Sequence, residues 1–154
     1  MKAGEKILSF QLEWIKNADS KVPPLFAINI AMIGLIVALI KALPSWTIPT
    51  AIFSSLTLIS LVLSIVFLAF SMFPRLRGPK GSIIFFGGIT QRSAEGYVEE
   101  IRNVSEENFE VDLIRQAYRN AEIAETKFRF VKYSFIATFI SVPFWGVSIY
   151  FLYI

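Results

Sequence analysis

The chain has 154 residues, of which 55% are hydrophobic and only 18% are charged, and its formal net charge is +3. Soluble domains carry about 25% charged residues, so this composition is typical of a membrane protein. The chain has no Cys and no His, which excludes disulfides, thiolate nucleophiles, Ser-His-Asp triads and the common zinc sites. We therefore expect neither an enzyme nor a metalloprotein, and no cofactor is predicted.

Three runs without a charged residue dominate the sequence: Val22 to Ile40, Ala42 to Pro74 and Tyr133 to Ile154. A helix needs about 20 apolar residues to cross the roughly 30 Å hydrocarbon core of a bilayer. The runs predict transmembrane helices at 23–40, 49–73 and 131–153. The expected fold class is an all-α membrane protein, with 1–154 as a single membrane domain.

Residues 4–20 have the periodicity of an amphipathic helix, with apolar side chains at Ile7, Phe10, Trp14 and Ala18. Such a helix either lies on the bilayer surface or packs on the cytoplasmic part of the protein. Pro23 and Pro24 follow. Because proline is tolerated in a first helical turn, the first span is expected to begin there, at an angle to the preceding helix.

The basic residues predict the topology. Fourteen of the fifteen Lys and Arg residues precede the first charge-free run or lie between the second and third runs, and Lys41 is the exception. Positive charge in short loops marks the cytoplasmic side. The prediction is a multi-pass membrane protein with a cytoplasmic N-terminus and an extracytoplasmic C-terminus.

Small residues four positions apart occur in the spans, as in the pairs Ala27 with Ala31 and Gly34 with Ala38. Such pairs let helices approach closely, and we expect most of them to pack within one subunit. A homo-oligomer is still expected, because three spans cannot easily enclose a pore alone.

The segment between the second and third spans, 75–130, is predicted to be a cytoplasmic, mainly helical sensor insert. It opens with a basic turn, Arg75 to Gly81, followed by the apolar run Ser82 to Phe86, which we interpret as a strand or an extended loop. A short helix is predicted from Ser93 to about Asn103.

Ser105 has the chemistry of an N-cap, and a helical pattern continues from it into the third span without a breaker before Pro143. Asp112 with Arg115, and Glu125 with Arg129, can form pairs on its exposed face. A sensor would then be joined directly to a transmembrane segment by one helix.

A binding function fits these residues better than a catalytic one. Basic residues from Arg75 to Lys80, with aromatic side chains nearby, have the chemistry to hold a phosphate and a base. The alternative is that the arginines anchor the inner end of the second span at lipid phosphates.

Short motifs in a fixed order resemble a known family. They are Leu12 to Lys21, Phe73-Pro74-Arg75, Phe85 to Ile89, Ala94 to Tyr97, and finally Asp112-Leu113, Gln116, Tyr118, Ile123-Ala124 and Lys127-Phe128. Together they resemble the small membrane effectors of Pycsar antiphage defence. Two positions depart from that family's pattern: Gly88 stands where an acidic residue is usual, and Leu76-Arg77-Gly78 lacks the usual Asn.

The resemblance implies a cytoplasmic site for a cyclic pyrimidine nucleotide, of the cyclic UMP or cyclic CMP type, made by a cognate cyclase. Binding would impair the integrity of the inner membrane and cause abortive infection. The membrane lipids and other copies of the chain would be the further partners, and no nucleic acid polymer is expected to bind.

Six residues are predicted to bind this ligand. Arg75 and Lys127, at the two ends of the insert, would supply positive charge to the cyclic phosphate. Asp19 and Lys21 would join from the start of the first span, although Asp19 could equally be a helix-end or salt-bridge residue. The aromatic members of the set are Phe86 and Tyr118.

A different class of function stays open. The chain could be a structural or partner subunit of a larger membrane complex, without a small-molecule ligand. A transporter or constitutive channel fits less well, because none of the three apolar runs contains an Asp, Glu, Lys or Arg, whereas ion pathways commonly carry such groups.

Overall fold

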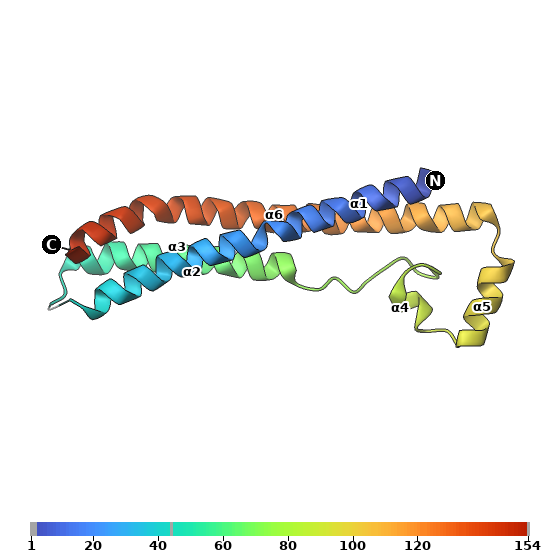
Figure 1. Cartoon of the computed structure of the whole chain (residues 1–154), viewed down its shortest axis with the longest axis horizontal. Coiled ribbons are helices and arrows are strands. Elements are labelled where there is room, and N and C mark those ends of the chain that lie inside the picture. Colours follow the sequence, from blue (N-terminus) through green and yellow to red (C-terminus); the bar gives the residue numbers. More distant parts are fainter. Residues whose placement is uncertain (1–2, 44, 154) are drawn as a thin grey trace. The chain divides into compact units, whose positions relative to one another are not determined.

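A computed structural model describes residues 3–43 and 45–153, and no strand occurs among them. The helices are α1 (Ala3–Ser20), α2 (Val22–Lys41), α3 (Ile48–Met72), α4 (Phe86–Ile89), α5 (Ala94–Asn103) and α6 (Glu106–Tyr153) (Figure 1). Three helical stretches are long and apolar enough to cross a membrane: α1 with α2, α3, and α6. The prediction of an all-helical membrane protein is confirmed, and the described residues contain three candidate membrane-spanning helices at the expected places.

The described residues form two compact units. We call the first the head unit; it contains the described residues up to Ala18 and Pro74–Thr126. The second is the membrane unit, which contains Asp19–Phe73 and the described residues from Lys127 onward.

A single residue, Lys21, separates α1 from α2. Its backbone angles, φ −81° and ψ −19°, are right-handed helical, and Pro23 and Pro24 follow in the first turn of α2. Proline removes no helical hydrogen bond there, because the first N–H groups of a helix have no intrahelical partner. The two prolines therefore do not open a loop between the helices.

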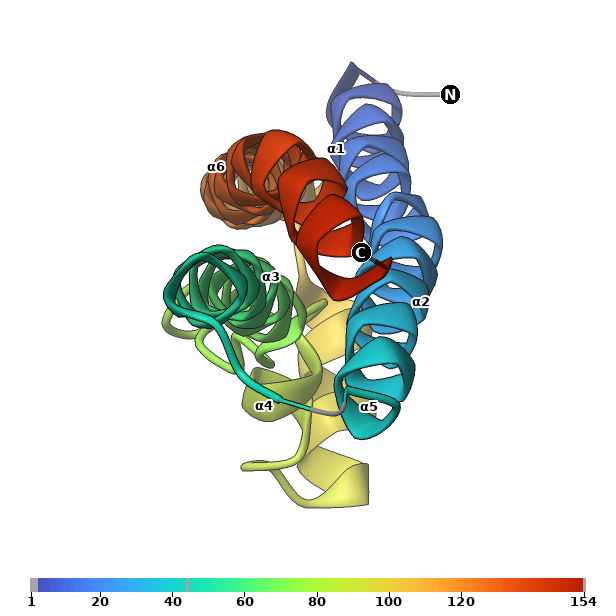
Figure 2. The same ribbon diagram turned by 90° about the vertical axis from the view of Figure 1, so that its left-hand side faces the viewer.

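The membrane unit is a bundle of α2, α3 and the C-terminal part of α6. In the end-on view these three helices lie side by side around a common interior (Figure 2). On α3 the buried positions alternate between spacings of four and three: Thr50, Ser54, Thr57, Leu61, Ser64, Leu68 and Ser71. Buried positions on this part of α6 follow the same rule, including Val131, Ser134, Thr138 and Ser141. This average spacing of 3.5 residues is that of left-handed coiled-coil packing.

Polar side chains, rather than large apolar ones, fill much of this interior. Ser64 Oγ lies 2.7 Å from Ser134 Oγ and 2.9 Å from Thr138 Oγ1, while Asn29 Nδ2 donates to Thr138 Oγ1 at 3.2 Å. Nearer the other end, Ser54 Oγ lies 2.8 Å from Ser148 Oγ. We call these six residues the hydroxyl seam. They join all three helices of the bundle by hydrogen bonds that water cannot supply in hydrocarbon.

The small-residue pairs of α2 do not pack in this interior. Ala27, Ala31, Gly34 and Ala38 are exposed, and a Cβ added at Gly34 would meet no atom within 4 Å. The buried side chains of α2 are Val22, Leu25, Asn29 and Ile36. The expectation that these pairs pack within one subunit is therefore wrong for α2. The face of α2 that packs in the bundle consists of the asparagine and the branched aliphatic side chains instead.

In the head unit, the N-terminus of α1 lies against α6. Gly4 N donates to Glu110 Oε1 at 2.6 Å, and a Cβ at Gly4 would lie 3.0 Å from Leu113 Cβ. The predicted helix starts are confirmed at both serines: Ser93 caps Gly96 N at 3.1 Å, and Ser105 caps Asn108 N at 3.2 Å. The helix that starts after Ser105 continues through Pro143 to Tyr153.

Candidate ligand-binding site

The segment between α3 and α4 folds back through a tight turn at Pro79–Ser82. Ser82 N donates to Pro79 O at 3.4 Å, and Gly81 has a φ of +73°. A positive φ at the third turn position favours glycine, because other residues meet a steric penalty there. The turn delivers Ser82 into the interior of the head unit, where its side chain is buried.

Ser82 and Asp112 together replace a strand partner for the residues that follow. Ser82 Oγ accepts from Ile84 N at 3.2 Å and Phe85 N at 3.0 Å, and it donates to Asp112 Oδ2 at 3.0 Å. The same carboxylate oxygen accepts from Ile83 N at 2.9 Å. Of the two interpretations of Ser82 to Phe86, the strand is wrong. The N–H groups of residues 83–85 bind the side chains of Ser82 and Asp112 and not a neighbouring strand. Nor does Asp112 pair with Arg115, since its carboxylate is directed at the loop.

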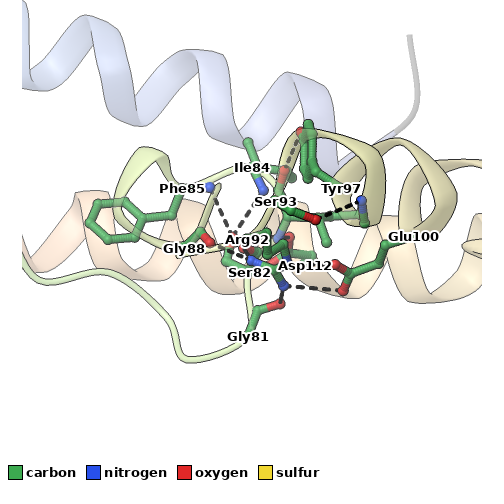
Figure 3. Close-up of polar contacts among 12 residues, drawn as sticks. Gly81, Ser82, Ile84, Phe85, Gly88, Arg92, Ser93, Tyr97, Glu100 and Asp112 are labelled. Carbon is green, nitrogen blue, oxygen red and sulfur yellow. Dashed lines mark hydrogen bonds and ion pairs between the residues drawn. The ribbon is translucent and has the colours of Figure 1, made fainter. Parts of the chain in front are cut away.

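Arg92 also binds this loop, beside Ser82 and Asp112 (Figure 3). Its guanidinium donates to the carbonyl oxygens of Gly81 at 3.1 Å, Ser82 at 3.2 Å and Gly88 at 2.6 Å. The carboxylate of Glu100 on α5 forms a bidentate ion pair with Nε and Nη2 of Arg92. This pairing raises the pKa of Arg92 above its ordinary value, so the charge is permanent.

Tyr97 of α5 adds a further contact, as its hydroxyl donates to Ile83 O at 2.8 Å (Figure 3). Gly88, Tyr97 and Asp112 belong to the motifs found in the sequence, and each of them takes part in the hydrogen bonds that hold this loop. A Cβ at Gly88 would lie 2.5 Å from Ser82 O, so glycine is required where the family pattern has an acidic residue.

Two pockets on the surface of the head unit lie next to the stretch Arg77–Pro79. The first, which we call the glycine pocket, has a volume of about 390 Å³ and includes Lys80, Phe85, Gly87 and Gln91 in its lining. A Cβ at Gly78 would meet the Phe85 ring at 2.3 Å, so this wall depends on a close approach of backbone to aromatic ring.

The second pocket, the tyrosine groove, has a volume of about 450 Å³. It is lined by Gly78, Pro79, Ile114, Arg115, Tyr118, Arg119 and Glu122. Tyr118 is 69% exposed, which leaves its ring available to a flat partner. Base–aromatic stacking needs such a face and tolerates any base.

The two arginines of the tyrosine groove differ in their partners. Arg119 donates to Arg77 O at 2.8 Å and pairs with Glu122 at 2.8 Å, so it fixes the Arg77–Pro79 stretch on α6. Arg115 is exposed and forms no ion pair with any residue that the structure describes. A guanidinium one helical turn from an exposed aromatic ring is well placed to contact a phosphate beside a stacked base.

The six residues predicted from the sequence fall in both units. Tyr118 lines the tyrosine groove, and Phe86 is the first residue of α4, with its ring centroid 4.6 Å from that of Phe85. Arg75 is half-buried in the stretch between α3 and α4. These three belong to the head unit, and neither Arg75 nor Phe86 lines the tyrosine groove.

The other three predicted residues belong to the membrane unit. Asp19 and Lys127 form an ion pair, and Lys127 is only 9% exposed. Asp19 thus has the salt-bridge role that the sequence left open as its alternative. Lys21 does not join that pair; it lines an apolar groove beside α6.

Sequence reasoning missed Arg115 as a candidate binding residue. The signal was its position three residues before Tyr118, which places both on one helix face. That signal was overlooked because Asp112, three residues earlier, offered a simpler partner for Arg115.

Comparisons with known proteins agree with the sequence motifs. No curated protein and no solved structure gave a significant match. A family model described as the Pycsar effector protein domain matches residues 4–152. This match covers nearly the whole length, and the chain belongs to the Pycsar effector family.

Proposed function

We propose that this protein is an antiphage effector that binds a cyclic pyrimidine nucleotide in the tyrosine groove and then impairs the membrane. Family membership supports the defence role. The observation that supports the binding site is the combination of an exposed Tyr118 ring with the unpaired cation of Arg115. In this proposal the protein is not an enzyme, and a cognate cyclase makes its ligand.

Each part of the nucleotide has a partner in the tyrosine groove. The base stacks on Tyr118 and contacts Ile114 and Pro79 at the apolar walls. The cyclic phosphate carries one negative charge and accepts from Arg115. Glu122 pairs with Arg119 through Oε2, and its other oxygen can accept from a ribose hydroxyl. The volume of about 450 Å³ lies within the range of roughly 300–1,000 Å³ that is usual for small-molecule sites.

Helix α6 is the proposed route from ligand to membrane. It carries Arg115 and Tyr118, and it continues without a break as the third membrane helix. A ligand shifts a conformational equilibrium only by its differential affinity for two states. We infer that the nucleotide favours a state in which the membrane part of α6 is repacked against α2 and α3, within an oligomer of the chain.

The orientation in this proposal has a cytoplasmic head unit, because fourteen of the fifteen basic residues precede the first apolar run or lie between the second and the third. A cytosolic nucleotide would then reach the tyrosine groove directly. A reporter fused after Ile154 should be active only outside the cytoplasm, and one inserted near Gly81 only inside. The reverse pattern would contradict both the orientation and access of the ligand.

Binding can be measured by calorimetry on the full chain in detergent, with cyclic UMP, cyclic CMP and cyclic AMP as ligands. Tyr118→Ala removes the stacking face, worth about 1–3 kcal/mol, so affinity should fall roughly tenfold to a hundredfold. Arg115→Gln should cause a loss of similar size, since a charge-assisted contact is worth about 1.5–3 kcal/mol. Tyr118→Phe keeps the ring and should bind almost as tightly as the wild type.

Arg102→Gln, an exposed change on α5 outside the tyrosine groove, is the matched charge control and should leave affinity unchanged. Arg75→Ala and Lys127→Ala test the positions predicted from the sequence. If those two weaken binding while Tyr118→Ala and Arg115→Gln do not, the ligand is not in the tyrosine groove. If no variant and no wild-type protein binds a cyclic nucleotide, the proposed function is wrong.

A further inference from the structure

An apolar groove in the membrane unit has a composition that neither the bundle nor the nucleotide proposal explains. It has a volume of about 560 Å³ and is lined by Lys21, Phe128, Val131, Lys132, Phe135, Ile136 and Phe139. We call it the α6 groove. Its lining is almost entirely apolar apart from two ammonium groups.

The length of the α6 groove matches one leaflet of a bilayer. Its α6 residues recur at spacings of three and four, so they share one face of the helix. From Phe128 to Phe139 the helix rises about 16 Å at 1.5 Å per residue. That is close to half of the roughly 30 Å hydrocarbon core.

The two lysines lie toward the same end of the α6 groove. Lys21 is two residues from Asp19, whose carboxylate pairs with Lys127, and Lys132 lies little more than one turn beyond Lys127. Phe139 lies at the opposite end and is 71% exposed. The groove therefore has a cationic end and an apolar end, like a binding site for an amphiphile.

Neither lysine has a counter-charge in the part of the chain that the structure describes. The nearby carboxylate of Asp19 is already paired with Lys127, whereas Lys21 and Lys132 form no ion pair. A membrane helix of a second copy would cover two ammonium groups without supplying an anion, because α2, α3 and α6 from Lys127 onward contain no Asp or Glu. Such burial is unfavourable in low dielectric. A phospholipid supplies both an anion and an acyl chain.

We propose that the α6 groove binds one anionic phospholipid, such as phosphatidylglycerol, from the adjoining leaflet. The acyl chain lies along Phe135, Ile136 and Phe139, and the headgroup phosphate accepts from Lys21 and Lys132. The inference does not depend on nucleotide binding, since it rests on residues of the membrane unit alone. Lys21, predicted as a nucleotide ligand, has a lipid-binding role in this proposal.

The test is a lipid titration of the full chain in neutral detergent, followed by native mass spectrometry. Phosphatidylglycerol should bind with a stoichiometry of one per chain, and phosphatidylcholine with the same acyl chains should bind more weakly. Lys21→Gln with Lys132→Gln should weaken phosphatidylglycerol about 25-fold, because each lysine near an anionic headgroup contributes about a fivefold preference.

Two further variants separate a site from general surface charge. Lys16→Gln with Arg129→Gln removes the same charge from exposed positions outside the α6 groove, and binding should be unchanged. Ile136→Trp keeps both lysines but fills the apolar end, and binding should weaken. An excess of glycerol 3-phosphate should not displace the lipid.

Three results would overturn the proposal. They are equal loss in the control pair and the groove pair, equal affinity for the two lipids, and unchanged binding in Ile136→Trp. Displacement by glycerol 3-phosphate would indicate a site for a free phosphate instead of a lipid.

Discussion

The head unit and the membrane unit both bury polar groups, but they use them differently. In the membrane unit, the hydroxyl seam joins helices whose backbone groups are already satisfied within each helix. In the head unit, Asp112, Ser82, Arg92 and Tyr97 satisfy the backbone of an irregular loop that pairs with no strand among the described residues. The comparison teaches that equal hydrogen bonds need not have equal energetic weight, because in the loop each loss leaves backbone groups unpaired.

The largest effect is expected at Asp112. Asp112→Ala removes the acceptor of Ile83 N and Ser82 Oγ, and charge-assisted bonds of this kind are worth about 1.5–3 kcal/mol each. The free energy of local opening of 82–89 should fall by about 3–6 kcal/mol, measured by hydrogen exchange on the full chain. Asp112→Asn keeps a side-chain oxygen and should retain most of the protection. Full protection in Asp112→Ala would contradict the structural role of this carboxylate.

A glycine pair gives the next comparison. Alanine at Gly78 places a Cβ 2.3 Å from the Phe85 ring, so Gly78→Ala should destabilise the head unit by about 1–3 kcal/mol and alter the glycine pocket. Gly34→Ala meets no atom within 4 Å and should be neutral or slightly stabilising. Hydrogen exchange of both variants checks this. Equal effects at the two sites would show that the close approach of Gly78 to Phe85 is unimportant.

A smaller loss is expected at Tyr97, which donates one neutral hydrogen bond to Ile83 O. Tyr97→Phe should lower the opening free energy of the same loop by about 1 kcal/mol, because it leaves that carbonyl without this donor. The measurement is the exchange of Ile84 and Phe85 amides. A loss as large as that of Asp112→Ala would mean that the loop depends on α5 more than on α6.

The smallest effect is predicted in the hydroxyl seam. Ser64→Ala removes contacts to Ser134 and Thr138, yet hydrogen bonds between membrane helices average only about 0.6 kcal/mol. Steric-trapping or denaturant titration in micelles should detect a change of this order. Ser55→Ala, on the exposed face of the same helix, is the control and should be silent. A loss at Ser64 exceeding that at Asp112 would reverse the comparison.

The sequence could predict the features that depend on neighbouring residues, but not those that depend on residues far apart along the chain. The spans follow from charge-free runs, and the caps Ser93 and Ser105 act within three residues of themselves, so local patterns were sufficient. The loop after Gly81 depends on Asp112, some thirty residues away, and its structure was not accessible from local propensity. The tyrosine groove likewise needs Gly78 and Pro79 to lie against α6, which no local pattern reports.

The central claim is that a nucleotide bound to the head unit acts on the membrane through α6. The direct measurement is dye release from liposomes containing the reconstituted chain, with cyclic UMP or cyclic CMP added outside. Release should require ligand in the wild type and be absent in Tyr118→Ala. A Gly-Gly-Ser insertion after Phe130, which interrupts α6 after the head unit, should bind ligand without release. Release without nucleotide, or equal release from wild type and insertion variant, would contradict the claim.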